Sequence, residues 1–384
     1  MKASQIRKAL AITLSMTLGA AALTGCGSSS TTSSSTASAS TSETATSEAA
    51  TSTAASGDFD PFTIYGVTDP QEAAQLIIAE KMGYYKEQGL DVTNQLIESS
   101  GDLPSYVAGG EAKVVAESIY TSVELAAQGM DCETITSNSN SAGTQCVVAG
   151  KGVTINSPKD LEGKKLGIMS GAGVYMALEK MCKENDVDIS TIEVSYLSPS
   201  EQVAALANGT IDLMACWEPY VSQAVDQGGT LLFTGSHCYI PGMEGDVNYM
   251  DFYSTITVTR DFYTDHRAEC VALVKAFAEA TDYINNNLDD AAKIIADYLN
   301  NDEATIKNIM SKNVYENVCN QSFVDATQAM AEYMLSNKLI DKIPDVDTYI
   351  TPDILKEVNP DGATYVPGTG ATTDEASSRA SSAA

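Results

Sequence analysis

The stretch Glu80–Val92, "EKMGYYKEQGLDV", leads from a helical pattern into an extended one and contains two glycines, Gly83 and Gly89. Glycine readily takes the left-handed backbone conformation that ends a helix. We therefore expect one helix to end at Gly83 and a single further turn to end at Gly89. The strand that follows from Leu90 would then run parallel to the strand that precedes the helix.

The same alternation of extended and helical patterns continues along the chain. Extended patterns occupy residues 62–66, 114–117, 165–169, 193–197, 211–216 and 253–259, and helical patterns follow most of them, at 71–82, 118–128, 174–184 and 201–208. Such alternation predicts an α/β fold, in which helices cover mainly parallel sheets. After residue 259 the pattern is almost entirely helical to about residue 358.

The N-terminal residues have the character of an export signal. Lys2, Arg7 and Lys8 precede an apolar run, Ala9–Leu23, which is too short to span a bilayer. The next residues, "LTGC", resemble the lipobox of bacterial lipoproteins, which implies that Cys26 becomes a lipid-modified N-terminus. An ordinary signal peptide with a chance cysteine is the alternative.

Two further segments are too polar to form a core. Residues 26–57 are almost entirely Ser, Thr and Ala, and residues 361–384 end in a similar composition. Segments of this kind cannot bury enough apolar surface to offset their ordering entropy. We expect residues 1–25 to be a signal peptide, 26–57 a tether and 361–384 a disordered tail.

Charge and cysteine usage exclude several classes of function. The net charge is −29, and removal of the basic leader makes the chain still more acidic, which argues against a nucleic-acid partner. The seven cysteines after Cys26 are dispersed and form no CxxC, so a disulfide framework is not expected, although one bridge remains open. The two histidines lie far apart in the sequence, and we expect neither a metal site nor another cofactor.

Several stretches carry a resemblance to a known family. They are "AEKMGYYKEQGLDV", "SSGDLPSYVAGGEAKVV", "SPKDLEGKKLGI" and "LSPSEQVAALANGTIDLMACWEPY". Together they resemble the nitrate/sulfonate/taurine and thiamine-pyrimidine-precursor family of ABC transporter substrate-binding proteins, in the right order over residues 62–358. The last stretch is similar to the sulfonate-binding branch of that family.

The resemblance implies a two-lobed, periplasmic-binding-protein-like fold of type II. Each lobe would be a mainly parallel sheet flanked by helices, and two crossover strands would form a hinge between them. Gln145–Ala149 and Tyr253–Thr259 fit those crossovers. The first lobe would then contain residues 58–148 and 254–360, and the second lobe residues 149–253.

Ligands of such sheets bind in the crevice beyond the carboxyl ends of the strands. The candidate solute-binding residues on the loops at these ends are Thr68, Asp69, Gln71, Ser100, Asp102, Ser118, Tyr120, Ser170, Gly171, Gly173, Tyr175, Trp217, Glu218 and Tyr253. The Ser170–Gly173 turn precedes a helix, whose free N–H groups favour an anion, but a purely structural turn is an equal alternative.

Trp217 and Glu218 are the most specific of these candidates. Trp217 is the only tryptophan and follows an apolar strand, so it is either a flat wall against the solute or a core residue. Glu218 would accept a hydrogen bond from a solute nitrogen or pair with a lysine, because an unpaired buried carboxylate is costly. Arginines are few and acids are common around the loops, which favours a zwitterion, an amine or an aromatic heterocycle over a simple sulfonate anion.

The resemblance implies a lipid-anchored solute receptor on the extracytoplasmic face of the cell membrane. Its partners would be a small organic solute, sulfonate- or taurine-like or another nitrogen-containing zwitterion, and an ABC permease with its ATPase. We expect a monomer that is not an enzyme. Import of a thiamine pyrimidine precursor or an aromatic amine is one alternative, and a non-transport sensor or an enzyme on the same fold is another. Enzymes of this family carry a cysteine-rich motif that this chain lacks.

Overall fold

Gly83 and Gly89 adopt the left-handed conformation, with φ of 86° and 76°, in the computed structural model, which describes residues 59–98 and 100–368. Helix α1 (Ala74–Met82) ends at Gly83, and the single turn α2 (Tyr84–Glu87) ends before Gly89. Strand β2 (Val92–Ile97) then pairs in parallel with β1 (Phe62–Val67). The reversal expected from the two glycines is therefore confirmed.

The first of two sheets has six strands in the order β13-β4-β12-β3-β1-β2. Its further strands are β3 (Val114–Ser118), β4 (Cys132–Asn140), β12 (Tyr253–Thr259) and β13 (Val314–Tyr315). Strand β1 runs parallel to both β2 and β3, whereas β12 runs antiparallel to β3 and β4. The carboxyl ends of β1 and β3 therefore lie at one edge of this sheet.

The second sheet has seven strands in the order β11-β10-β9-β5-β8-β6-β7. These are β5 (Gln145–Ala149), β6 (Lys165–Ile168), β7 (Glu193–Tyr196), β8 (Leu213–Trp217), β9 (Thr230–Thr234), β10 (His237–Cys238) and β11 (Gly245–Asp246). Strand β6 runs parallel to β7 and β8, and β5 runs antiparallel to β8 and β9.

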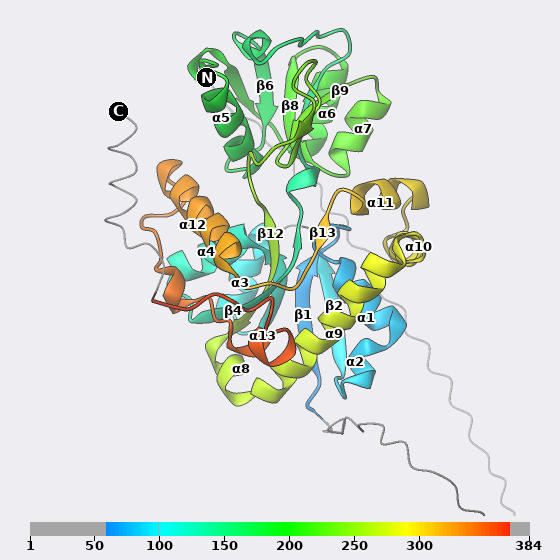
Figure 1. Ribbon diagram of the computed structural model, residues 1–384, viewed down its shortest axis with the longest axis vertical. Helices are drawn as coiled ribbons and strands as arrows, with labels where there is room; N and C mark the ends of the chain where they lie inside the picture. The colour runs from blue at the N-terminus through cyan, green and yellow to red at the C-terminus, as the bar shows by residue number, and fades with distance from the viewer. Residues whose placement is uncertain (1–58, 99, 369–384) are drawn as a thin grey trace, which may run out of the picture. The chain divides into compact units, whose positions relative to one another are not determined.

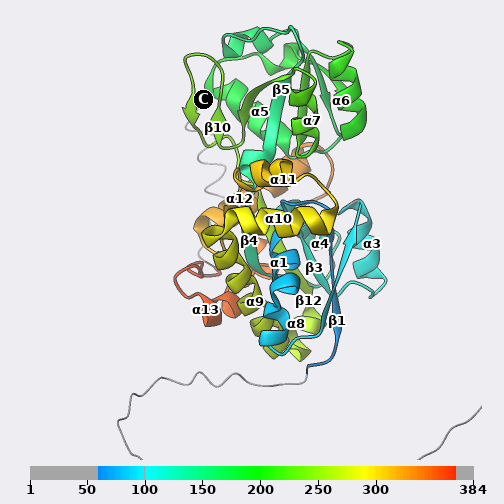
Figure 2. The same ribbon diagram turned by 90° about the vertical axis from the view of Figure 1, so that its right-hand side faces the viewer.

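Helices accompany both sheets (Figures 1 and 2). With the first sheet are α1 and α2, α3 (Leu103–Ala108), α4 (Ile119–Ala127), α8 (Arg260–Asp265), α9 (Arg267–Asn286), α10 (Leu288–Leu299), α11 (Glu303–Met310), α12 (Gln321–Ser336) and α13 (Asp353–Val358). With the second are α5 (Val174–Glu184), α6 (Pro199–Ala207) and α7 (Tyr220–Asp226). We call the first sheet with its helices the first lobe, and the second sheet with its helices the second lobe.

The two-lobed α/β prediction is confirmed, but three details differ. Both sheets are mixed rather than mainly parallel, because the strands that follow each change of lobe run antiparallel to their neighbours. The predicted hinge strands are each bonded within a single sheet, so the chain changes lobe just before them, at residues 141–144 and 251–252. Strand β5 thus belongs wholly to the second sheet, whereas the expected boundary after residue 148 would divide it.

The third difference concerns the C-terminal tail. Ala363 and Tyr365 are buried in the core of the first lobe, and the Tyr365 N–H donates to the Cys319 carbonyl over 3.0 Å. Residues 361–365 are therefore part of the packed lobe rather than of a disordered tail. The predicted signal peptide, the tether, Cys26 and the end of the tail from residue 369 lie outside the described residues.

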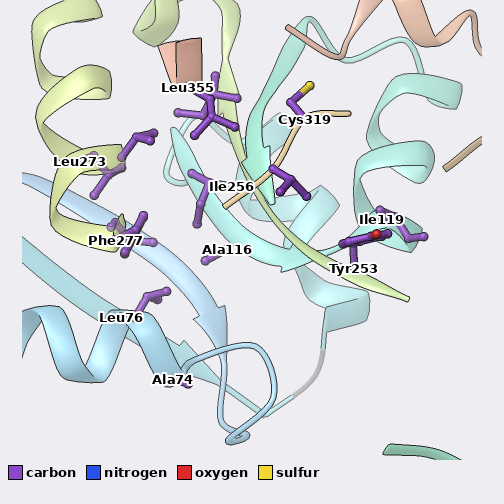
Figure 3. Packing of buried hydrophobic residues seen from close by; sticks show 14 of the residues in the cluster. Ala74, Leu76, Ala116, Ile119, Tyr253, Ile256, Leu273, Phe277, Cys319 and Leu355 are labelled. Atoms are coloured by element: carbon purple, nitrogen blue, oxygen red, sulfur yellow. The ribbon is translucent and has the colours of Figure 1, made fainter. Parts of the chain in front are cut away.

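The cores follow the sheets. In the first lobe, side chains from β1, β3 and β12 pack against α1, α9 and α13, as Figure 3 shows for Leu76, Ile256, Phe277 and Leu355. The second sheet carries one apolar cluster on each face. In residues 59–98 and 100–368, no helix combines the length and the apolar character needed to cross a membrane. The seven cysteines of this part are all free and buried, so they form no bridge among themselves.

Candidate functional site

Asp69 lies two residues beyond β1 and shapes the turn that leads into α1. Its Oδ1 accepts hydrogen bonds from the backbone N–H groups of Gln71, over 2.8 Å, and of Glu72, over 2.7 Å. An aspartate that accepts bonds from the backbone ahead of it forms a local turn that other residue types make poorly. Gln71 and Glu72 are thereby held beside Asp69 at the carboxyl end of β1.

Glu117 lies at the same edge of the sheet, on β3. Its register places it one residue beyond the Gly66–Ala116 pair that joins β1 to β3. The Glu117 Oε2 atom accepts hydrogen bonds from the hydroxyls of Ser118 and Thr121, each over 2.6 Å, and from the Ser118 backbone. The Ser118 side chain, a predicted solute contact, is buried and already bonded to Glu117.

Asp69, Glu72 and Glu117, called the acidic cluster below, lie close enough to influence one another's ionisation. Burial, with the charge of Glu117, raises the pKa of Asp69 to about 7, although the two N–H bonds oppose the shift. Burial, together with Glu117 and Asp69, also holds the pKa of Glu72 well above its ordinary value. Like charges and desolvation both disfavour the ionised carboxylate.

Two side-chain oxygens beside this cluster have no hydrogen-bond partner. They are Glu72 Oε2 and Gln71 Oε1, and these two residues are only 5% and 2% exposed. Buried polar atoms are nearly always paired, because an unpaired one costs free energy. Gln71 uses its other side-chain atom, Nε2, to donate to the carbonyl oxygen of Glu218 over 3.1 Å. This bond joins the β1 loop of the first lobe to the β8 loop of the second.

The Ser170–Gly173 turn of the second lobe also contacts the first lobe. The Tyr333 hydroxyl donates to the Ala172 carbonyl over 3.0 Å. Gly171 has φ of 80°, and a side chain there would meet Leu339 and the Tyr120 hydroxyl. The structure therefore brings together Tyr120 and Gly171, two of the predicted residues.

Glu218 is not free to bind a solute in this structure. It is fully buried; its Oε1 lies 2.6 Å from Lys312 Nζ, and its Oε2 accepts a bond from the Ser222 N–H over 2.9 Å. Of the two alternatives drawn from the sequence, pairing with a lysine is the one found. The predicted hydrogen bond from Glu218 to a solute nitrogen stays a prediction, and these contacts argue against it.

The surroundings of Tyr253 argue against a direct contact with the solute. It is 4% exposed, and its ring stands edge-on to Phe323, with 5.3 Å between ring centres and 87° between ring planes. Figure 3 shows it beside Ile119 within the core of the first lobe. The ring packs as a core residue because β12 begins inside the first lobe, and the contact of Tyr253 with a solute stays a prediction.

The remaining predicted residues differ in their surroundings. Trp217 ends β8 and is half-buried against the clusters on both faces of the second sheet. Tyr175 is half-buried between the two cores. Thr68 and Asp102 are exposed, and the Thr68 hydroxyl donates to the Ile97 carbonyl over 3.1 Å. Ser100, Ser170 and Gly173 lie in turns, and their role in binding stays a prediction.

A groove of about 700 Å³ is lined by residues of α5, of α12 and of the segment before β12. Its walls include Glu179, Lys183, Tyr249, Asp325 and Tyr333, and none of the predicted solute-binding residues lines it. The groove nevertheless reaches residues 248–251, in the segment that leads to β12. Sequence reasoning also missed Glu72 and Lys312. Glu72 directly follows the predicted residue Gln71, so the same loop could have indicated it. Nothing in the sequence near Lys312 indicates that it pairs with Glu218, 94 positions away.

Comparison with known proteins agrees with this architecture. The sequence matches the family described as NMT1/THI5 like over residues 71–291. It is 24% identical, over 312 residues, to a putative aliphatic sulfonates-binding protein of Bacillus subtilis (strain 168), which covers 79% of this chain and 90% of that protein. That relative is described as a binding protein rather than an enzyme.

Two solved structures show the same fold. The periplasmic aliphatic sulphonate binding protein SsuA from Escherichia coli has a TM-score of 0.65 at 16% identity, over 76% of this chain and 92% of that one. The desulfurization enzyme DSZB has a TM-score of 0.57 at 13% identity, over 78% and 99%. The fold of this chain is therefore that of two-lobed periplasmic binding proteins, and the chain belongs to the NMT1/THI5-like family.

Proposed function

We propose that this protein is the extracytoplasmic solute-binding component of an ABC importer and holds a small organic solute between its two lobes. The observation that carries the proposal is the bond from Gln71 Nε2 to the Glu218 carbonyl. It joins loops at the carboxyl ends of strands in two different sheets, which is where ligands of open α/β sheets bind. The description of the Bacillus subtilis relative as a binding protein supports it.

We further propose that the N-terminal segments anchor the protein to the membrane, as the sequence predicts. Residues 1–25 act as a lipoprotein signal, Cys26 carries the lipid, and residues 26–57 tether the lobes to the extracytoplasmic face of the membrane. The partners are a permease and its ATPase, and the protein works as a monomer. The solute is sulfonate- or taurine-like or another nitrogen-containing zwitterion, with a thiamine pyrimidine precursor or an aromatic amine as the second candidate.

An enzyme on the same fold is a weaker candidate. Its support is the structural likeness to DSZB, which at 13% identity concerns the fold alone. Burial raises the pKa of the thiols of Cys132 and Cys182 to about 11, and a thiol that stays protonated is a poor nucleophile. Binding without chemical conversion therefore accounts better for the described residues.

A thermal-shift screen tests the proposal. The panel contains alkanesulfonates, taurine, amines, amino acids and aminopyrimidines. A compound that binds the native state raises the melting temperature by mass action. We expect at least one compound to raise it in a concentration-dependent way and to be recovered chemically unchanged. Failure of the whole panel would contradict the proposal, and conversion of the bound compound would favour the enzyme.

A further inference from the structure

The acidic cluster is assembled by the fold and not by proximity in sequence. Asp69 follows β1, Glu117 lies on the neighbouring parallel strand β3, and Glu72 precedes α1. Different contacts restrain the three residues. Asp69 is restrained by the turn it caps, Glu117 by its bonds with Ser118 and Thr121, and Glu72 by its burial. Three carboxyl groups thus lie at the same strand ends, where the proposed solute binds.

No cation of the described residues neutralises this cluster. Lys312 pairs with Glu218. Arg260 pairs with Asp131 and Glu133, and Arg267 pairs with Glu357. Within residues 59–98 and 100–368, the acidic cluster takes part in no salt bridge. The negative charge of the cluster is therefore relieved either by proton uptake, as the raised pKa of Asp69 and Glu72 indicates, or by a cationic ligand.

A second observation points to a ligand independently of the charges. Glu72 Oε2 and Gln71 Oε1 are unpaired acceptors on side chains that are at least nine-tenths buried. Both residues follow Asp69 in the same turn, and Gln71 also contacts the loop of the second lobe. An acceptor that is buried without a donor is unfavourable until a donor reaches it. The site therefore lacks N–H donors as well as positive charge.

We propose that the acidic cluster binds the cationic nitrogen group of an organic solute, together with the side-chain oxygen Oε1 of Gln71. The inference rests on the proposed solute-binding function and narrows it. A primary ammonium, amidinium or guanidinium group supplies positive charge and several N–H donors at once.

Other ligand chemistries fit these residues less well. A sulfonate group is an acceptor only and carries negative charge, so it would be repelled by the cluster. Among the described residues, no group of three or more His, Cys, Asp or Glu side chains is arranged to hold a metal ion. A zwitterion such as taurine remains compatible, with its ammonium at the acidic cluster and its sulfonate elsewhere.

The test compares solutes that differ in one group. Taurine and isethionate share the same sulfonate and carbon chain, but taurine ends in an ammonium and isethionate in a hydroxyl. Agmatine carries an ammonium and a guanidinium without a sulfonate, and ethanesulfonate carries a sulfonate without nitrogen. Isothermal titration calorimetry on the full mature chain measures each affinity. We expect binding of taurine, agmatine or both, and affinity roughly 10- to 100-fold weaker or undetectable for isethionate and ethanesulfonate.

Two conservative variants connect the preference to the cluster. Glu72→Gln and Asp69→Asn each replace a carboxyl group with an amide of nearly the same shape that cannot form an ion pair, and both should weaken binding of the nitrogen cation about tenfold or more. Glu98→Gln makes the same carboxyl-to-amide change at an exposed residue just beyond β2, and this matched control should leave affinity unchanged. Thermal unfolding of each variant verifies that the fold is intact.

The outcomes separate this inference from the proposed function. Tight binding of isethionate or ethanesulfonate, or unchanged affinity of Glu72→Gln and Asp69→Asn for a nitrogen cation, would overturn the acidic cluster as the recognition site while leaving a solute-binding protein. Binding of no compound in either panel would overturn both. Loss of cation binding in the two variants, with retention in Glu98→Gln, would support the assignment.

Discussion

Lys312 Nζ lies 2.6 Å from Glu218 Oε1, and this ion pair links the segment before β13 in the first lobe to the loop after β8 in the second. The carboxylate is fully buried and the lysine side chain is 20% exposed. Removal of one partner from a buried pair leaves an uncompensated charge, which is far more costly than loss of an exposed pair. The pair therefore contributes to the stability of the arrangement in which the two loops meet.

We predict that Lys312→Met lowers the free energy of unfolding by about 3–5 kcal/mol, because it leaves the Glu218 carboxylate buried without an opposite charge. The double variant Lys312→Met, Glu218→Gln should recover part of the loss. Urea unfolding provides the measurement. Lys307→Met is the matched control, since its partner Asp289 is exposed, and should cost less than about 1 kcal/mol. If Lys312→Met and Lys307→Met lowered the free energy of unfolding equally, the buried Lys312–Glu218 pair would contribute no more to stability than the exposed pair.

We also predict that the same pair affects how far the lobes open. Small-angle X-ray scattering of the unliganded protein should give a larger radius of gyration for Lys312→Met than for the unmodified chain, because one link between the loops is lost. A saturating solute should reduce the radius in the unmodified protein through hinge closure. A radius that does not change with a solute proven to bind would count against closure.

The acidic cluster predicts an unusual dependence of stability on pH. The pKa of Asp69 is raised to about 7, and that of Glu72 is also raised, with Glu117 and Tyr315 as the other titratable groups beside them. Between about pH 4 and pH 7 the folded chain therefore holds more protons at these carboxyls than the unfolded chain does. This contribution to stability is present at low pH and is lost as the pH rises through the folded pKa.

The corresponding measurement is the melting temperature of the unliganded protein at about pH 5 and about pH 8. Relative to the unmodified chain, Asp69→Asn should gain stability at the higher pH, because asparagine has no charge to bury and can still accept the turn hydrogen bonds. Glu98→Gln should show no such gain. If the melting temperatures of Asp69→Asn and the unmodified chain differed by the same amount at both pH values, a raised pKa of Asp69 would be excluded.

Trp217 allows a direct optical test, because the sequence contains no other tryptophan. If its half-buried ring also contacts the solute, binding should shift or quench the intrinsic fluorescence in proportion to occupancy. Titration with a solute whose affinity is known from calorimetry provides the measurement. An unchanged emission spectrum at saturation would leave Trp217 as a core residue between the two faces of the second sheet.

The proposed anchor is tested in cells. Replacement of Cys26 by alanine should release the protein from the membrane fraction or leave its leader uncleaved, because the lipid is attached to that thiol. Fractionation followed by immunoblotting measures the distribution. Normal processing together with unchanged membrane association would show that Cys26 is not the anchor.

The sequence predicted some elements to the residue and missed others entirely. Helix α5 and strand β12 have the predicted bounds, since their apolar periodicity is strong. Strand β4, "CETITSNSN", was not predicted, because nearly all its side chains are polar and yet eight of the nine residues are buried. Its hydroxyls bond to those of the neighbouring strand, as in Thr134–Thr257 at 3.0 Å and Ser139–Ser254 at 2.9 Å. Because the buried side chains of β4 are mostly polar and bond to one another across strands, the sequence of β4 shows no hydrophobic alternation from which a strand could be predicted.

The candidate site was predictable to the same limited extent. The crevice rule led to Asp69 and Gln71, whose loop does contact the second lobe. The rule uses only the position of a residue relative to a strand. It therefore could not distinguish Tyr253, which packs inside the core, from a residue that faces a crevice. Nor could it pair Glu218 with Lys312, since ion pairs between distant segments depend on how the lobes meet.

The seven buried, unpaired cysteines have a practical consequence. Maleimide and related labels need an accessible thiolate, and burial raises the pKa of Cys132 to about 11 and of Cys216 and Cys270 to about 12. A cysteine introduced at an exposed position such as Tyr196, which is 71% exposed, would therefore react alone in the folded chain. Starting from a mature form without Cys26, a single environment-sensitive dye could be attached there without replacing any native cysteine of the lobes. The natural protein is in this respect already a scaffold for a fluorescent sensor of its own solute.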